Sequence, residues 1–538
     1  MLTARPRRES GHLLIHRYIS IHPSINPSLL PSIHPSFPQE EVKALRMARK
    51  PSPARSLAIA EELAEECDRD LRAAASPEDL ATARAASVAA VKGLLAGDAS
   101  FSAYSIRAAL SPGDANGCLR DPVVYRGNTE TPHHRTGRTH KAYPTYDFAC
   151  PFVDSVEGVT HALRTSEYKD REAQYYRMLS LMRRVRPDLR EVHIWDYAKL
   201  QMIGTILSKR KLQWLIDAGR ASGWDDPRFP TVRGLARRGM RMEALREFVV
   251  SQGASRNVTY QEWDKIWTLN KRLIDPIAPR HTAVGGGGVS GGGGGSVLLE
   301  LDPASPGCPG PEGEAVTVPA HPKNAEVGSK CQHRQRNLVV DAEDAAFLAA
   351  SLAERRAAGA DAPPLSTLRE GDSLPAEATF DYGNGYEFTL MGWGNAVVTA
   401  VEVDAATGAP TLVRAALRTG GDFKKTKLKA TWLPADNNLT VPIEMRRLHP
   451  LLIKDKPDDD DDIAAISTPP PGFDAAFARG DGSMRRLSRG DVIQVERRGF
   501  YIVDRALGEP GAEEEDRVVL VDVPDGRGMA KSGVGASK

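Results

Sequence analysis

The chain has little cysteine, almost no net charge and no long apolar run. Each of these absences argues against certain classes of protein. Its five cysteines are scattered singly without a CxxC pair, which argues against a structural zinc site and a disulfide framework. No apolar run approaches the roughly 20 residues that span a bilayer. The 71 basic and 70 acidic residues leave a formal net charge of +1. Binding to a polyanion would therefore depend on local patches of positive charge. Because no apolar run is long enough to span a bilayer, we expect no membrane association.

Residues 1–50 differ in composition from the rest of the chain. The segment ISIHPSINPSLLPSIHPSFP, residues 19–38, places a proline every few positions, which prevents a helix or a central strand from propagating. We expect a disordered extension. An organelle transit peptide is the alternative, because Arg5, Arg7 and Arg8 precede a segment poor in acids, although proline breaks the amphipathic helix that such peptides need.

The sequence between residue 56 and residue 275 indicates helices mixed with a few strands. Alanine-rich residues 56–95 predict two helices, and residues 104–125 predict short strands around a turn. A compact α/β module should follow. Its expected elements are a strand near 146–148, a helix from about 171 to 182, a strand at 192–195 and, after a basic loop, a mostly helical block from 211 to 275.

A glycine run separates this part from a second half of different character. The run GGGGVSGGGGG, Gly285 to Gly295, has no side chains with which to pack and predicts a flexible linker. From Val297 onward, short alternating runs broken by Gly, Pro and Asp predict antiparallel barrels or sandwiches. A helical insertion at 342–360 and the acidic run at 458–462 interrupt this pattern, and we expect both to be solvated surface.

Loop residues Leu207-Ser208-Lys209-Arg210-Lys211 place three cations beside a serine, after a predicted strand and before a helix. Cations so placed could grip a triphosphate and neutralise the charge that develops as pyrophosphate departs. By itself the cluster is also typical of a solvated basic turn.

Several longer stretches share one resemblance. They are GCLRDPVVYR (117–126), YPTYDFACP (143–151), ILSKR (206–210), GWDDPRFPTVRGLARRGM (223–240), EWDKIWTLNKRLIDPIAPRHTAV (262–284), AHPKNAEVG (320–328), KKTKLKATWLP (424–434) and GDVIQVERRGFYIVD (490–504). In these stretches the chain resembles class I aminoacyl-tRNA synthetases of the glutamyl/glutaminyl subfamily, and most closely the eukaryotic cytosolic glutamyl-tRNA synthetases. The resemblance extends from about Ser105 onward.

This resemblance implies an α/β fold followed by an all-β half. The expected parts are a disordered extension (1–50), a connective module for the tRNA acceptor stem (51–139), the second half of a Rossmann-like catalytic domain with the lysine-rich loop (140–215), a helical stem-contact region (216–284), a glycine-rich linker (285–296), anticodon-binding β-barrels (297–525) and a tail (526–538).

The resemblance places Arg164 and Tyr146 in the amino-acid pocket. A bidentate guanidinium suits a carboxylate, whereas a neutral amide would leave its charge unpaired, so Arg164 indicates glutamate. The glutaminyl enzymes have a cysteine at this position. Without the resemblance, Arg164 could be a surface residue paired with Glu167 or Asp170, and Tyr146 could be an ordinary core residue on a strand.

The resemblance also assigns residues to ATP and to tRNA. Expected ATP contacts are Thr165, Lys199, Leu200, Leu207, Ser208 and Lys209, and the expected catalytic residues are Ser208, Lys209 and Arg210. Lys199 replaces the arginine usual in the family, and Leu207 replaces a methionine of similar volume. Candidate tRNA phosphate contacts are Arg228, Arg233, Arg237 and Arg238. ATP would carry Mg²⁺, and we expect no metal bound by the protein alone.

The function implied is that of a cytoplasmic glutamate–tRNA ligase, which joins glutamate to tRNA(Glu) through a glutamyl adenylate. The family's first catalytic half, with its His-Ile-Gly-His signature, has no counterpart in the sequence, and the segment Ser10 to His16 resembles it only by coincidence. We therefore expect the chain to bind ATP poorly as it stands. A catalytically inactive tRNA-binding fragment is the alternative function, and a glutaminyl-tRNA synthetase is a more distant one.

Overall fold

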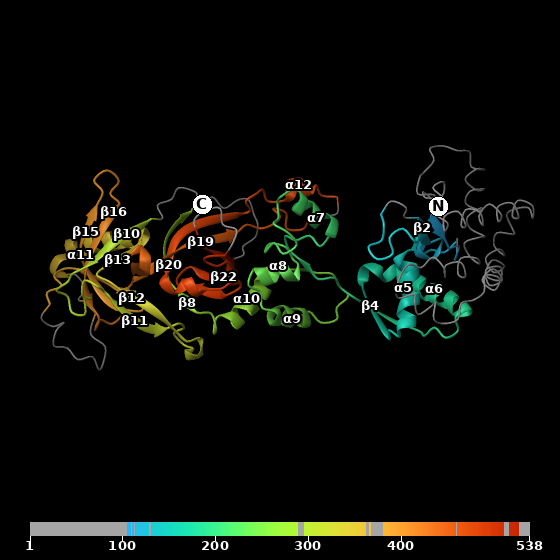
Figure 1. The fold of residues 1–538 in the computed structure, drawn as a ribbon, viewed down its shortest axis with the longest axis horizontal. Helices are drawn as coiled ribbons and strands as arrows, with labels where there is room; N and C mark the ends of the chain where they lie inside the picture. The colour runs from blue at the N-terminus through green and yellow to red at the C-terminus, as the bar shows by residue number, and fades with distance from the viewer. Residues whose placement is uncertain are drawn as a thin grey trace, which may run out of the picture. The chain divides into compact units, whose positions relative to one another are not determined.

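A computed structural model describes residues 105–526, except residues 109, 112, 128–130, 289–294, 362–364, 367–379, 459 and 510–515. The expectations for residues 1–50, for helices within 56–95 and for the tail after 526 lie outside the described residues. By its internal contacts the chain divides into two compact units, both drawn in Figure 1. The first comprises the residues up to 199 together with 254–259, and the second comprises residues 200–253 and those from 260 onward.

The first unit begins with an antiparallel sheet and continues with a parallel pair of strands. The antiparallel sheet consists of β1 (Ser105–Arg107), β2 (Val123–Gly127) and β3 (Ala142–Pro144), with the 3-10 helix η3 (Gly117–Leu119) between β1 and β2. The parallel pair is β4 (His161–Thr165) and β5 (His193–Tyr197), joined through η4 (Ser166–Arg171) and α6 (Glu172–Val185). Parallel neighbours require such a crossover. The expected short strands, helix and second strand are confirmed.

Helix α5 (Tyr146–Glu157) stands where the sequence predicted a strand near residues 146–148. That prediction is wrong because Phe148, Pro151, Phe152 and Ser155 recur at helical spacing and are the residues buried on one face of α5. Thr145 precedes the helix in an extended conformation, and Gly158 ends it with a left-handed φ of 77°. Tyr146 is therefore the first residue of a helix rather than a strand residue.

Four helices open the second unit, as the sequence predicted for residues 211–275. They are α7 (Lys209–Asp217), α8 (Val232–Arg237), α9 (Met242–Ser251) and α10 (Trp263–Ile274), and the short strands β6 (Gln201–Met202) and β7 (Tyr260–Gln261) pair beside them. Buried Phe248, Trp267 and Ile274 share a core with Phe500 and Val521. The helical block is thus packed onto the β-strands that follow it in the chain.

The first of two seven-stranded sheets in the second unit has the order β8-β21-β22-β23-β19-β20-β9. Its strands are β8 (Arg280–His281), β9 (Ala283–Gly288), β19 (Thr440–Leu448), β20 (Phe473–Asp481), β21 (Val492–Val495), β22 (Gly499–Arg505) and β23 (Val518–Val523). The two edge strands, β8 and β9, are separated in sequence only by Thr282. A sheet whose edges are one residue apart must curl round until they meet, so we call this sheet barrel A.

The second seven-stranded sheet, barrel B, has the order β17-β14-β15-β16-β10-β13-β18. Its strands are β10 (Ser296–Leu301), β13 (Asn337–Asp341), β14 (Tyr386–Leu390), β15 (Gly394–Val403), β16 (Pro410–Arg418), β17 (Lys429–Ala430) and β18 (Trp432–Pro434). Only Thr431 separates its edge strands, β17 and β18, so it curls in the same way. The expected β-barrels are confirmed as barrel-like sheets, but the sheets are mixed rather than antiparallel, because β10 pairs in parallel with β16 and β19 with β23.

Shorter elements decorate the barrels. They are the hairpin of β11 (Glu314–Pro319) and β12 (Ser329–Arg334), the helices α11 (Ala342–Ala358) and α12 (Ile463–Ile466), and the 3-10 helices η5 (Ala325–Val327), η6 (Gly359–Asp361), η8 (Asn437–Leu439) and η9 (Gly482–Arg486). None of the helices that the structure describes is long and apolar enough to cross a membrane.

Two expectations for this half need correction. Helix α11 is not solvated surface, because Ala345, Leu348 and Leu352 are buried in the core of barrel B. The first part of the glycine run is not a free linker either. Residues 285–288 belong to β9 and pair with β20, where the absence of side chains does not prevent backbone hydrogen bonding.

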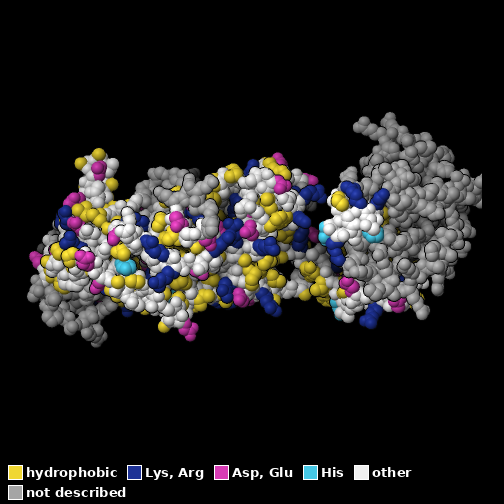
Figure 2. Space-filling model, in the orientation of Figure 1, with side chains coloured by type: hydrophobic (Ala, Val, Ile, Leu, Met, Phe, Trp, Pro, Cys, Tyr) yellow, Lys and Arg dark blue, Asp and Glu magenta, His cyan; other side chains and the backbone are white. Residues whose placement is uncertain are grey.

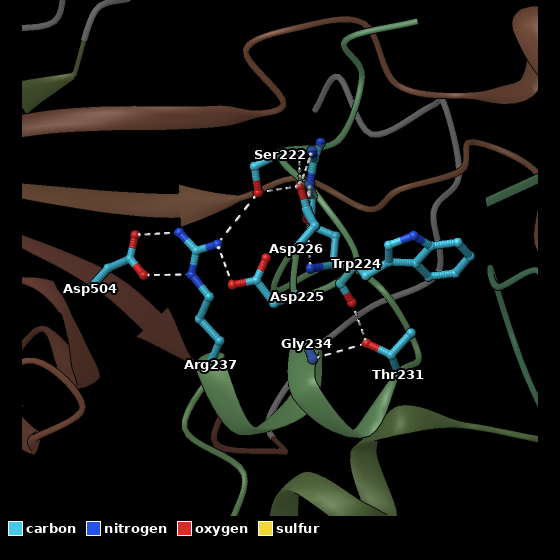
Figure 3. Close-up of polar contacts among 9 residues, drawn as sticks. Ser222, Trp224, Asp225, Asp226, Thr231, Gly234, Arg237 and Asp504 are labelled. Atoms are coloured by element: carbon cyan, nitrogen blue, oxygen red, sulfur yellow. Dashed lines mark hydrogen bonds and ion pairs between the residues drawn. The ribbon is translucent and has the colours of Figure 1, made fainter. Parts of the chain in front are cut away.

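The turn before α8 is packed too tightly to admit a side chain at Gly234. Thr231 caps the helix, since its hydroxyl accepts a hydrogen bond from the Gly234 amide at 3.0 Å and donates one to the Trp224 carbonyl at 2.9 Å (Figure 3). A Cβ at Gly234 would lie 2.4 Å from the Asp226 carbonyl oxygen and 2.8 Å from that of Phe229. Both neighbours are backbone atoms, so the turn itself would have to move.

The substitution Gly234→Ala should therefore destabilise the second unit by about 1–3 kcal/mol, the usual cost of overpacking. Gly310→Ala is the matched control, because no atom lies within 4 Å of a Cβ there and its φ is not left-handed. Thermal unfolding followed by circular dichroism compares the two variants. Equal melting temperatures for both would contradict the close packing.

Candidate functional site

Arg164 is the central cation of the first unit. It lies on β4 opposite Asp196 of β5, and only 7% of its surface is exposed. Its guanidinium carbon lies 4.6 Å from the ring centre of Tyr168, 5.4 Å from that of Tyr146 and 5.7 Å from that of Tyr175. Ring faces attract a cation at these distances. Three tyrosines thus hold a buried guanidinium, and we call this group the tyrosine cage.

One edge of the Arg164 guanidinium is not satisfied by the protein. Its Nε and Nη2 atoms are buried and have no hydrogen-bond partner among the residues that the structure describes. These two nitrogens point to the same side of the guanidinium, the side that binds both oxygens of a carboxylate at once. An unpaired buried cation is costly. The edge is therefore suited to an incoming carboxylate.

The nearest carboxylate to that edge belongs to Asp147 on α5. Its Oδ1 lies 3.7 Å from Arg164 Nη2, too far for a hydrogen bond, and is itself buried without a partner among the described residues. Its Oδ2 accepts a hydrogen bond from Arg171 Nη1 at 2.5 Å. A surface pocket of about 670 Å³ adjoins this group, and its lining includes Arg126, Tyr143, Tyr146, Asp147, Arg171 and Gln174.

Tyr146 presents a neutral hydroxyl to this region. About half of the residue is exposed, but burial of the remainder, with a hydrogen bond to Cys150, raises its pKa to about 12. The phenol is therefore protonated throughout the physiological range. It can donate a hydrogen bond to a ligand without adding negative charge beside Arg164.

Thr165 and Lys199, two of the expected ATP contacts, share one carboxylate. Glu167 accepts a hydrogen bond from Thr165 Oγ1 at 3.4 Å and forms an ion pair with Lys199 Nζ at 3.1 Å. They lie where the parallel strands β4 and β5 end, and ligands of α/β sheets bind outside such carboxyl ends. The alternative pairing of Arg164 with Glu167 or Asp170 is wrong, since Arg164 is buried and Glu167 contacts Lys199.

The basic loop belongs to the second unit and begins helix α7. Ser208 is the N-cap, its hydroxyl makes no capping bond, and Lys209 and Arg210 occupy the first turn with exposed side chains. The side chain of Ile206 is buried in an apolar cluster and so holds the start of the loop, whereas Leu207 is exposed. Free amide groups and the helix dipole favour an anion at such an end. Leu200, by contrast, packs against the core shared by the helices and barrel A.

Lys211, the third cation of the loop, is already engaged. Its Nζ donates to the carbonyl oxygen of Asp458 at 2.9 Å, in the acidic run that the sequence predicted to be surface. The structure therefore groups Tyr146 with Arg164, and Thr165 with Lys199, within the first unit. It groups Ser208, Lys209 and Arg210 within the second.

Three of the four arginines expected to contact tRNA phosphates have carboxylate partners inside the second unit. Arg228 has a side chain that is only 7% exposed and pairs with Asp226 through Nε and Nη2, both at 2.9 Å. Arg237 pairs with Asp504 of barrel A at 2.7 and 2.9 Å, as Figure 3 shows. Arg238 lies 3.5 Å from Asp522 and 5.7 Å from the ring centre of Trp267.

These pairs already engage the guanidinium groups of Arg228, Arg237 and Arg238, so each offers less charge to a phosphate than a free arginine would. Their contact with tRNA stays a prediction. Only Arg233 is exposed and forms no ion pair among the described residues. In Figure 2, basic side chains on the visible face of the second unit are interspersed with acidic and hydrophobic ones. This pattern agrees with local rather than global attraction of a polyanion.

Two family models match the chain. Residues 46–276 match the catalytic domain of "tRNA synthetases class I (E and Q)", and residues 278–418 match the anti-codon binding domain of the same family. The chain belongs to the glutamyl and glutaminyl class I tRNA synthetase family. The two matches meet between α10 and β8, where the chain changes from helices to barrel A.

Curated relatives agree with this assignment. The chain is 42% identical over 429 residues to "Glutamate--tRNA ligase, cytoplasmic" of Saccharomyces cerevisiae, and 39% identical over 437 residues to the Arabidopsis thaliana protein of the same name. It is 40% identical over 430 residues to "Probable glutamate--tRNA ligase, cytoplasmic" of Schizosaccharomyces pombe. These matches cover 80–81% of this chain and 51–52% of each relative. The chain thus spans about half the length of these relatives.

Sequence reasoning missed several members of the candidate site around Arg164. Asp147, Tyr168, Arg171 and Tyr175 surround Arg164 but were not singled out. Asp147 directly follows Tyr146, and Arg171 follows Arg164 by seven residues, so their charges were visible signals. In the part of the chain that the structure describes, no three His, Cys, Asp or Glu side chains group so that they could hold a metal ion.

The pair of Arg237 and Asp504 makes a pH-dependent contribution to stability. Burial of Asp504 raises its pKa, but hydrogen bonds and charge from Arg237 outweigh this and lower the pKa below the ordinary value. A carboxyl group with a lowered folded-state pKa stabilises the protein above its unfolded pKa of about 4. That stability is lost as the pH falls through the folded-state pKa.

Asp504→Asn should therefore destabilise the second unit by about 2 kcal/mol at pH 7, and by progressively less below pH about 4. Thermal melts of the parent and the variant at pH 7 and pH 3 measure the difference. Asp225→Asn is the matched control, because Asp225 lies 3.3 Å from Arg237 but its side chain is 49% exposed. A deficit of equal size at both pH values would disprove the ionic origin.

Proposed function

We propose that the chain provides glutamate recognition and tRNA binding for a glutamate–tRNA ligase. In this reaction ATP activates glutamate as glutamyl adenylate, and the amino acid is then transferred to tRNA(Glu). The observation that carries the proposal is the buried, unsatisfied edge of Arg164 inside the tyrosine cage. The named relatives that match the chain are glutamate–tRNA ligases.

The charge of Arg164 favours glutamate over glutamine as the substrate. A side-chain carboxylate would accept two hydrogen bonds from Nε and Nη2 and neutralise the guanidinium. A glutamine amide offers one acceptor oxygen and no charge, which would leave a buried cation uncompensated. The neutral phenol of Tyr146 suits either substrate. A glutaminyl-tRNA synthetase is therefore the less favoured reading of the same fold.

Chemistry in this proposal depends on positioning and on charge. The α-carboxylate of glutamate attacks the α-phosphorus of ATP, and pyrophosphate leaves. A terminal ribose hydroxyl of the tRNA then attacks the carbonyl of the glutamyl adenylate, the acyl–phosphate bond breaks and AMP leaves. Lys209, Arg210 and the amide end of α7 would neutralise the departing pyrophosphate, with Ser208 as a hydrogen-bond donor. Mg²⁺ bound to ATP would supply further neutralisation at the phosphates. No protein nucleophile is needed.

Contacts with ATP and tRNA complete the proposal. Thr165 and Lys199 lie at the carboxyl ends of the parallel strands, a position suited to the nucleotide. Leu200 and Leu207, in the second unit, are the remaining proposed ATP contacts. Arg233 is the proposed phosphate contact on the helices, and the two barrels are proposed to read unpaired anticodon bases. Cytoplasmic location is proposed from the names of the relatives.

A tRNA-binding protein without ligase activity is the second candidate. The chain matches only about half the length of its curated relatives, and the unmatched part of those relatives could hold groups that the reaction needs. Glutamate-dependent exchange of pyrophosphate into ATP, measured with this chain and tRNA(Glu), separates the candidates. Exchange supports the ligase; binding of tRNA(Glu) without exchange supports the second candidate.

Arg164→Gln should lower kcat/KM for glutamate in that exchange roughly 100-fold, because it removes the charge that pairs with the substrate carboxylate. The effect should fall mainly on KM for glutamate and leave KM for ATP unchanged. Arg183→Gln, an exposed arginine on α6, is the control. An unchanged KM for glutamate in the Arg164 variant would exclude this arginine as the substrate contact.

Lys209→Ala should lower kcat by about two orders of magnitude with little change in KM for glutamate, because its charge is needed mainly as pyrophosphate departs. Lys265→Ala on α10 is the control, since that side chain is also exposed and belongs to the same unit. Steady-state exchange rates measure both. A change confined to KM for glutamate would show that Lys209 does not act on the departing pyrophosphate.

A further inference from the structure

Two arginines of the first unit compete for one carboxylate. Asp147 Oδ2 accepts from Arg171 Nη1 at 2.5 Å, while Asp147 Oδ1 stays 3.7 Å from Arg164 Nη2. The first contact is a short charge-assisted hydrogen bond, and the second is outside hydrogen-bond range. Asp147 is therefore held by Arg171 and only approaches Arg164.

Tyr168 reinforces this arrangement. Its ring centre lies 4.6 Å from the guanidinium carbon of Arg164 and 5.4 Å from that of Arg171, so one aromatic ring attracts both cations. Arg164 and Arg171 carry two positive charges, and Asp147 supplies one negative charge. Asp147 is thus shared between two cations, and a substrate carboxylate would give Arg164 a partner of its own.

We propose that Arg171 is a positioning residue that holds Asp147 away from Arg164 and so keeps the Arg164 edge free for the substrate carboxylate. The inference rests on the function proposed for Arg164. Arg171 acts through Asp147 and need not touch glutamate. In this role Asp147, in the first turn of α5, competes with the substrate carboxylate for Arg164. Arg171, at the end of η4, restrains Asp147.

The consequence of losing the Arg171 charge follows from the distances. Asp147 Oδ1 is buried without a hydrogen-bond partner among the described residues, and Arg164 Nη2, 3.7 Å away, likewise has none. Without Arg171, Asp147 needs to move by only about 1 Å to reach hydrogen-bond distance. It would then occupy the edge that glutamate requires, and glutamate would have to displace it.

Binding of glutamate measured by isothermal titration calorimetry tests the proposal with four forms of the full chain. Arg171→Gln should raise the Kd for glutamate about tenfold, the effect of a competing ion pair of ordinary strength. The double variant Asp147→Asn with Arg171→Gln should recover most of that loss, because the amide no longer competes for Arg164. Arg171→Lys should stay close to the parent, since it keeps the charge.

Rescue separates this role from a merely structural one. If Arg171 only supported the fold, a second substitution beside it would not restore binding. A double variant as weak as Arg171→Gln alone would overturn the proposal, as would an Arg171→Gln variant that binds glutamate like the parent. Arg183→Gln serves as the control for removing an exposed arginine from the same unit.

A crystal structure of the ligand-free Arg171→Gln variant gives a readout that requires no activity. Asp147 should then lie within about 3 Å of Arg164 Nε or Nη2. An Asp147 that remains as far from Arg164 as in the parent chain would overturn the proposal even if binding had changed. Failure of the proposed function is recognised separately, because then the parent chain would not bind glutamate or Arg164→Gln would bind it equally well.

Discussion

The candidate site depends on one buried charge that the protein leaves partly unpaired. Arg164 is surrounded by the rings of Tyr146, Tyr168 and Tyr175, and the edge with its Nε and Nη2 has no hydrogen-bond partner among the described residues. Such an arrangement costs stability unless a ligand completes it. The proposed preference for an acidic substrate and the proposed restraint on Asp147 both rest on this charge. The Tyr146 phenol stays neutral because burial raises its pKa against the opposing effect of Arg164.

Charge is used differently in the second unit. There, arginines of the helices are neutralised by aspartates, including Arg237 by Asp504 of barrel A and Arg228 by Asp226. The Arg237–Asp504 pair joins the helical block to barrel A, next to an apolar core that the two also share. The Arg228–Asp226 pair lies within the turn that precedes α8. The GWDDPRFPTVRGLARRGM stretch therefore has a structural role, in which Arg228, Arg237 and Arg238 pair with aspartates of the same unit. Arg233, which points outward, is the exception.

Much of the fold could be predicted from the sequence because its signals are local. Helical spacing of apolar residues predicted α6 and the block from α7 to α10, and alternating runs predicted the barrels. The failures have physical causes. The strand expected near residues 146–148 was wrong because three residues are too few to show a helical repeat. The repeat is visible only when the buried residues from Phe148 to Ser155 are taken together. Glycines 285–288 form a strand because pairing with β20 uses backbone groups alone.

The candidate site was predictable only in part. Arg164 and the basic loop could be found as motifs, but the partners Asp147 and Arg171 depend on how α5 and η4 meet, which spacing does not reveal.

The most direct test of the central charge is calorimetric binding of glutamate and of glutamine to the unmodified chain under the same conditions. Glutamate should bind at least about tenfold more tightly, the value of one carboxylate paired with the guanidinium. Equal affinities, or a preference for glutamine, would contradict a site built around an unpaired Arg164.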